Sequence, residues 1–141
     1  MNITQLTDMS CTLACFEAFS AQNGGTVTQR EIILRYPGYC QGDQPQPGYL
    51  LTRDYTAVAA FFGIRCEAIS PYPLLLPHYP RRAILIGAGN FHGHEHSILW
   101  IRALPGDRGI AINPNTHISD YMRFNLGDLR HWHCSFWKLE A

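Results

Sequence analysis

The feature that most constrains the fold is a change in hydrophobic pattern near residue 63. Before it, apolar residues recur at the spacing of amphipathic helices; after it, short runs rich in Ile, Leu and Trp alternate with Pro and Gly. Helices followed by strands are typical of an α+β domain, with helices packed on one antiparallel sheet. The 141 residues suit one hydrophobic core, so we expect a single domain over 1–141.

The first two expected helices carry terminal signals. Ser10 is a good N-cap for the first helix, which Asn23 and the two glycines after it end. Thr28 and Glu31 have the spacing of a capping box at the start of the second helix. Pro37-Gly38 is expected to end that helix.

A loop and a third helix follow. The stretch 38–50 is rich in Gly and Pro, which predicts a loop long enough to face a substrate. The third helix is expected over about 52–62, with Thr52 as its cap and Gly63 closing it. Its buried side is predicted to carry Val58, Phe61 and Phe62.

The second half is expected to be mostly strands. Their predicted ranges are 64–69, 83–88, 96–103 and 109–114. The segment 105–109 indicates a hairpin turn between the last two. The tail over about 126–139 is expected to form a short helical turn and a final strand over 134–139.

Charge and composition exclude several classes of function. Eleven basic residues balance eleven acidic ones, so no net positive field favours nucleic acid, and no basic run favours a membrane surface. No apolar run is long enough for membrane insertion, and no signal peptide is evident. We expect a cytoplasmic protein or one secreted by a signal-peptide-independent route. Five cysteines favour reduced thiols, with a Cys40–Cys134 disulfide left open.

Cys11 is the candidate nucleophile. In the first turn of a helix, free backbone N–H groups and the helix dipole stabilise a thiolate, which is the attacking form of cysteine. Gln5 lies six residues upstream, where its side-chain amide and the Cys11 N–H can form an oxyanion hole. Cys15, one turn further along, is interpreted as core packing.

His96 and Asn113 complete the predicted site. His96 opens the strand HSILWI, and the partner strand of its hairpin ends at Asn113. Antiparallel pairing brings the end of the second strand back beside the start of the first, so Asn113 is expected next to His96. Its carbonyl oxygen would orient the imidazole toward Cys11. His94 is the rival for the base.

These residues resemble a known family. QLTDMSCTLACFEAF is similar to the start of the peptidase domain of peptide and bacteriocin exporters, which removes double-glycine leader peptides. HSILWI and the later Asn113-Pro114 resemble the His strand and Asp-Pro of that family. The resemblance implies a papain-like α+β fold and a cysteine hydrolase acting on a peptide or protein. It implies no cofactor and no metal, and assigns catalysis to Cys11, His96, Asn113 and Gln5.

Four positions depart from the family pattern. Thr12 stands where the family has Gly, Ser10 and Asn113 where it has Asp, and Ser97 where it has an aromatic residue. A standalone, divergent member is therefore expected. The fold and the nucleophile chemistry carry over, whereas double-glycine specificity does not.

Several functions stay open at this point. Attack on a peptide bond followed by water gives a peptidase, attack on a glutamine side chain gives a deamidase, and an amine acceptor gives a transglutaminase. By analogy of fold, a bacterial effector or toxin with a host-protein target or a cognate inhibitor is a further alternative. A non-catalytic binding module is another. His92, His94 and His96 have a spacing that would suit a metal on one strand face.

Overall fold

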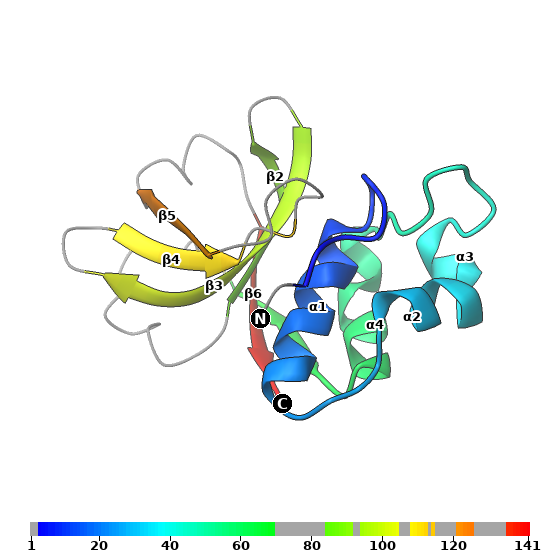
Figure 1. Ribbon diagram of the computed structural model, residues 1–141, viewed down its shortest axis with the longest axis horizontal. Helices are drawn as coiled ribbons and strands as arrows, with labels where there is room; N and C mark the ends of the chain where they lie inside the picture. The colour runs from blue at the N-terminus through cyan, green and yellow to red at the C-terminus, as the bar shows by residue number, and fades with distance from the viewer. Residues whose placement is uncertain are drawn as a thin grey trace.

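The helices and the sheet form two sides of the molecule. The computed structural model describes residues 3–69, 84–91, 94–104, 108–112, 114, 121–125 and 135–141. Figure 1 shows the helices gathered on one side and the strands on the other. The fold is thus mixed α+β, with N-terminal helices and a C-terminal antiparallel sheet, as predicted. No helix in the described ranges is long and apolar enough to span a bilayer.

The helices occupy the first half of the chain. In order they are α1 (Cys11–Gln22), α2 (Gln29–Arg35), α3 (Pro37–Cys40), the 3-10 helix η1 (Thr52–Asp54) and α4 (Tyr55–Phe61). Ser10 occupies the N-cap of α1, and Gly24 adopts φ +83° just beyond its end, where glycine is favoured. The predicted position of the first helix is confirmed.

The segment from Thr28 to Cys40 holds two helices. The Thr28 side chain accepts a hydrogen bond from the Glu31 N–H at 3.2 Å, which confirms the predicted cap of α2. The second helix ends at Arg35, just before Pro37-Gly38, as predicted. The predicted loop over 38–50 begins too early, because Pro37–Cys40 form α3, of which Pro37 is the first residue. Proline suits that position, since its missing N–H needs no intrahelical partner there.

The third predicted helix is divided. Thr52 begins η1, and Asp54 is the N-cap of α4, so the assignment of Thr52 as the α-helical cap is wrong. Val58 and Phe62 are buried as expected. Phe61 is half-buried and stacks on Tyr36 of the α2–α3 junction with ring centroids 3.8 Å apart.

Six strands form one sheet in the order β1-β6-β2-β3-β4-β5, and all neighbouring pairs are antiparallel. They are β1 (Arg65–Ala68), β2 (Ile84–Phe91), β3 (His94–Leu104), β4 (Arg108–Ile112), β5 (Tyr121–Asn125) and β6 (Ser135–Glu140). The predicted β3–β4 hairpin pairing is confirmed, since Leu104 pairs with Arg108 and Leu99 with Ile112. The turn residues 105–107 lie outside the described residues.

Two strand predictions need correction. The strand predicted over 96–103 is longer in the structure, because β3 begins at His94 and ends at Leu104. Pairing with Phe91 of β2 extends the strand by two residues. β5 was not predicted, and it pairs with β4 from Ile112↔Tyr121 to Arg108↔Asn125. The short helical turn expected after residue 126 lies outside the described residues.

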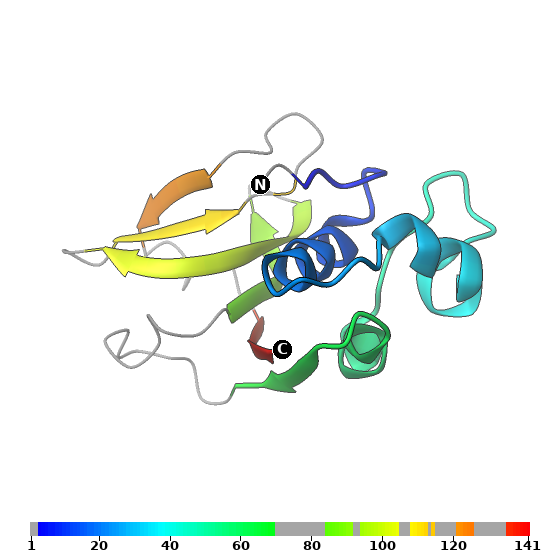
Figure 2. The ribbon, with the colours of Figure 1, turned by 60° about the horizontal axis from the view of Figure 1, so that its bottom comes forward.

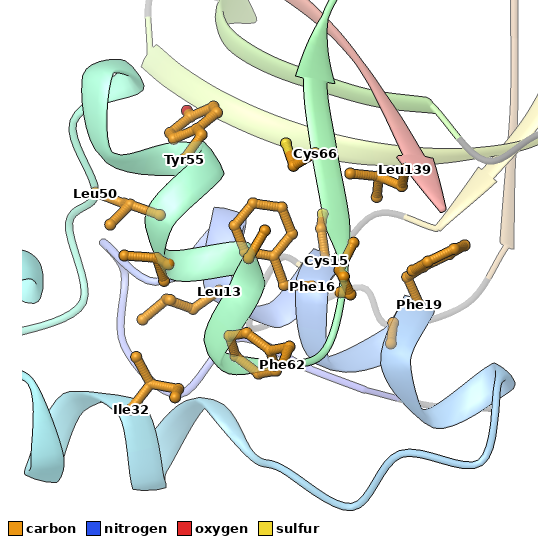
Figure 3. Packing of buried hydrophobic residues seen from close by; sticks show 14 of the residues in the cluster. Leu13, Cys15, Phe16, Phe19, Ile32, Leu50, Tyr55, Phe62, Cys66 and Leu139 are labelled. Carbon is orange, nitrogen blue, oxygen red and sulfur yellow. The ribbon is translucent and has the colours of Figure 1, made fainter. Parts of the chain in front are cut away.

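The main core lies between α1, α4 and the sheet. α1 packs on β3 and α4 packs on β1, and Figure 2 shows α1 and α4 running side by side next to the sheet. Phe16 of α1 is fully buried, with its ring edge-on to Tyr55 and tilted against Phe62. Figure 3 shows Phe16 in the middle of this core, with Tyr55, Cys66 of β1 and Leu139 of β6 on one side of it and Phe62 on the other. This packing places α1 against the sheet.

Candidate active site

The first turn of α1 begins at Cys11. Ser10 is fully buried and sits at the N-cap, yet its hydroxyl makes no cap bond to the helix. Instead the Ser10 Oγ accepts from the Thr7 N–H at 2.9 Å and donates to the Thr7 carbonyl at 3.2 Å. The N-terminal end of the helix therefore keeps N–H groups that Ser10 does not satisfy, and no acidic side chain lies in its first turn. Such an end favours negative charge, including a thiolate.

Gln5 is held in the segment before α1. Its side chain is 6% exposed, and its Nε2 donates to the Thr7 carbonyl at 2.8 Å. The same carbonyl accepts from Ser10, so Gln5 and the residue before Cys11 share one acceptor. The backbone N–H of Gln5 donates to Pro114 at 2.7 Å, which ties this segment to the chain after β4.

The Gln29 side chain of α2 binds the backbone of the residues before and after Gln5. Its Nε2 donates to the Thr4 carbonyl at 2.8 Å, and its Oε1 accepts from the Leu6 N–H at 3.0 Å. Sequence reasoning missed Gln29, because nothing in the local pattern links residues 23 or 25 positions apart. Gln5 therefore lies in a segment with a defined position. Its Oε1 has no hydrogen-bond partner in the described part of the chain.

A pocket of about 170 Å³ opens beside Cys11. Asp8 and Met9, both exposed, lie at one side of it. The segment 49–52 lines it from the other side, and the buried residues Thr12, Tyr55 and Ser97 contribute as well. The volume is comparable to the engineered cavity of about 150 Å³ that holds benzene in another protein. It is therefore large enough for one medium-sized side chain.

Three buried hydroxyls meet at this pocket. Thr12 Oγ1 lies 2.8 Å from Ser97 Oγ and 3.3 Å from the Tyr55 hydroxyl. The three residues come from α1, β3 and α4 and are 5%, 1% and 2% exposed. Burial raises the pKa of Tyr55 to about 12, with hydrogen bonds from Thr12 and Ser97 acting in the opposite direction. Tyr55 is therefore a neutral hydroxyl near neutral pH. Sequence reasoning missed Tyr55.

Cys15 belongs to the core, as predicted. It is fully buried, and its thiol donates to the Ser97 carbonyl at 3.7 Å. Burial raises the pKa of the Cys15 thiol well above its usual range, and the nearby Cys11 adds to the rise. A thiol of this kind stays protonated and unreactive. Cys40, whose disulfide was left open, is a free thiol.

The strand that carries His96 lies against the Cys11 helix. The backbone of His96 is in β3, paired with Gly89 of β2, and Ser97 follows it directly. Ser97 contacts Thr12, the residue after Cys11. The side chains of His94 and His96 lie outside the described part of the structure, as do His92 and Asn113 entirely. The His96–Asn113 pairing and the histidine metal site therefore stay predictions. Among the described residues, no three metal-ligating side chains cluster.

The fold is that of known peptidase domains. No protein-family model and no curated protein matches the sequence. One similar solved structure is a double glycine motif protease from an AMS/PCAT transporter in complex with the leader peptide, with a TM-score of 0.69 at 12% identity. The match covers 99% of this chain and 89% of that one.

A second similar structure is the peptidase domain of Streptococcus ComA, a bi-functional ABC transporter involved in a quorum sensing pathway. It has a TM-score of 0.71 at 12% identity and covers 99% of this chain and 96% of that one. At this identity the likeness establishes a papain-like fold over nearly the whole chain and leaves the activity to be argued from the site.

Proposed function

We propose that the protein is a cysteine peptidase that cleaves a peptide or protein substrate bound at the pocket beside Cys11. One observation carries the proposal: Cys11 lines a pocket and is the first residue of α1. The Ser10 side chain does not cap this helix, and the chain has the fold of peptidase domains. Cys11 is partly exposed, so a substrate can reach its thiol, and the helix N-terminus stabilises the reactive thiolate. Cys15 and Cys66 are buried.

The proposed reaction has two steps. The Cys11 thiolate attacks the carbonyl carbon of the scissile bond, and the negative charge on oxygen is held by the Cys11 N–H and the Gln5 amide. His96, oriented by Asn113, takes the thiol proton and gives it to the leaving amine. The carbon–nitrogen bond breaks, the amine leaves, and the acyl group stays on Cys11 as a thioester. Water then hydrolyses this thioester to a carboxylic acid and the free thiol.

The chemistry of Gln5 fits this role. Its NH2 group has two hydrogens, and among the described residues only the Thr7 carbonyl accepts one, which leaves the other for the oxyanion. The same hydrogen bond fixes which end of the amide is the nitrogen, since an oxygen there would face another carbonyl oxygen. A buried donor of set orientation requires little reorganisation during the reaction.

The pocket favours a substrate other than a double-glycine peptide. A volume of about 170 Å³ leaves space beside Cys11 that glycine would not fill. We therefore infer that a substrate residue with a side chain enters it. No feature of the described site favours a deamidase, a transglutaminase or a toxin over a peptidase.

The first test is the reactivity of each cysteine. Iodoacetamide labelling is measured by mass spectrometry against pH in the wild type, in His96→Ala and in His94→Ala. An ordinary thiol has a pKa of about 8.5, so its reactivity falls steeply below neutral pH. We expect Cys11 to label fast below about pH 7 and to lose this advantage in His96→Ala. His94→Ala is the matched control, because it removes an imidazole from the same strand.

The second test is cleavage. A peptide library is incubated with the wild type and with Cys11→Ser, and the products are identified by mass spectrometry. New termini that appear with the wild type alone support the peptidase. A Cys11 that labels with the pH dependence of a simple thiol refutes the catalytic proposal and favours a binding module. Loss of reactivity in His94→Ala alone would assign the base to His94.

A further inference from the structure

Two of the four residues that differ from the pattern of the leader-peptidase family contact each other in the structure. Thr12 follows Cys11 and Ser97 follows His96, and their hydroxyl oxygens are 2.8 Å apart. We propose that Thr12, Ser97 and Tyr55, here called the hydroxyl cluster, are positioning residues that hold the nucleophile end of α1 at a set distance from the His96 strand. This inference rests on the proposed function.

The contact between α1 and β3 is made at two points. Thr12 bonds to the Ser97 side chain, and one helical turn later the Cys15 thiol donates to the Ser97 carbonyl. A buried hydrogen bond restrains the distance between its two oxygens to a few tenths of an ångström, whereas apolar packing allows sliding. The Thr12–Ser97 hydrogen bond therefore joins the residue after the proposed nucleophile Cys11 to the residue after the proposed base His96.

Tyr55 joins the cluster from α4. Its hydroxyl lies 3.3 Å from Thr12 Oγ1, and its ring is held edge-on to Phe16 and 5.0 Å from the ring of Trp137. A ring packed on two sides brings its hydroxyl to a defined place. Because the raised pKa keeps Tyr55 neutral, the cluster introduces no charge beside Cys11.

The cluster acts as a unit because all its members are buried. Each hydroxyl has one hydrogen to donate and lone pairs to accept, so three hydroxyls can satisfy one another. A buried hydroxyl without a partner is unfavourable, so the loss of one member leaves the other two poorly satisfied. The local packing then shifts. In enzymes, a displacement of about 1 Å at the reacting groups lowers the rate by as much as about a hundredfold.

The test uses variants that remove one hydroxyl with little change of shape. Thr12→Val keeps the branched side chain, and Ser97→Ala removes only the oxygen. We expect each to lower the rate of Cys11 alkylation near pH 6 about tenfold, equivalent to a shift of about one unit in the midpoint of the pH profile. The double variant should be no slower than Thr12→Val alone, because Thr12→Val already removes the hydrogen bond to Ser97.

Three further variants separate positioning from general stability. Ser20→Ala removes another buried hydroxyl of α1, whose partner is the Phe62 carbonyl at 3.2 Å. It should lower the melting temperature and leave the Cys11 profile unchanged. Ser97→Thr keeps a hydroxyl and should restore the profile. Tyr55→Phe retains the ring and should slow alkylation by roughly two- to fivefold, since its bond is the longer one.

The outcomes distinguish the two proposals. If wild-type Cys11 is activated but Thr12→Val, Ser97→Ala and Tyr55→Phe all keep the wild-type pH profile, the hydroxyl cluster has no positioning role. If the Thr12 or Ser97 variants do not fold, Tyr55→Phe alone decides, and a profile equal to wild type overturns the inference. If wild-type Cys11 reacts like a simple thiol, the proposed function fails and the inference fails with it.

Discussion

Gly48 is the position where one added methyl group should reach the proposed active site. Its φ is +113°, and its N–H donates to the Cys40 carbonyl at 2.7 Å. A Cβ at this position would lie 2.5 Å from the Cβ of Ser10 and 3.1 Å from its Cα. Ser10 is buried directly before Cys11, so it has little space to move away. Gly48→Ala should therefore strain the backbone and push on the first turn of α1.

The expected loss of stability has two parts. A non-glycine residue at such a φ costs roughly 1–3 kcal/mol, and overpacking costs roughly 1–3 kcal/mol more. The reduced entropy of the unfolded chain offsets about 0.4–1 kcal/mol. We expect a net decrease of about 3 kcal/mol in the free energy of unfolding, or roughly 6–12 °C in melting temperature.

Two other glycines separate these parts. Gly24 has φ +83° but no atom within 4 Å of its added Cβ, so Gly24→Ala carries the backbone strain without the clash. Gly38 has neither feature, and Gly38→Ala should be neutral or slightly stabilising. Urea unfolding should rank the variants Gly38→Ala, Gly24→Ala and Gly48→Ala from most to least stable.

Cysteine labelling completes this test. Alkylation of Cys11 should slow at least about tenfold in Gly48→Ala, because small displacements of reacting groups have large effects on rate, and should be unchanged in the other two variants. The reasoning is refuted if Gly48→Ala unfolds at the same urea concentration as Gly24→Ala with wild-type Cys11 reactivity. That result would mean that the loop holding Gly48 can shift away from Ser10 at no cost.

Three further predictions concern the fold and its pH dependence. Thr28→Ala removes the cap of α2 and should lower the free energy of unfolding by about 1 kcal/mol in urea titrations, whereas Thr28→Ser should retain most of it. Phe16→Ala leaves a cavity at the centre of the core and should lower the free energy of unfolding by about 3–5 kcal/mol in the same assay. A decrease below about 1 kcal/mol would mean that neighbouring side chains fill the cavity. The folded pKa of Tyr55 is raised from 10.0 to about 12, so the folded state holds the proton more tightly than the unfolded state. Its contribution is fully present below pH 10 and is lost as pH rises toward 12, so wild type should lose more stability than Tyr55→Phe between about pH 9.5 and 11.5.

Local signals allowed much of the helical half to be predicted. The bounds of α1, the Thr28 cap of α2 and the buried positions of Val58 and Phe62 depend on residues within a few positions of one another. Capping side chains and hydrophobic spacing act over one or two turns, so they can be read directly from the chain. The helix α3 was not predicted, because proline both ends and begins helices and Pro37 was interpreted only as the end of the preceding one.

The sequence by itself determined the α+β class, the placement of Cys11 at a helix start and the core role of Cys15. These follow from hydrophobic spacing and from the preference of serine for the N-cap position, which Ser10 occupies without making a cap bond. Only the tertiary structure decided that Thr12 meets Tyr55 and Ser97, which are 43 and 85 positions away in the chain. It also decided that Gln29 holds the Gln5 segment and that β5 joins the sheet. Such contacts depend on how helices and strands pack in space, and no short stretch of sequence encodes that packing.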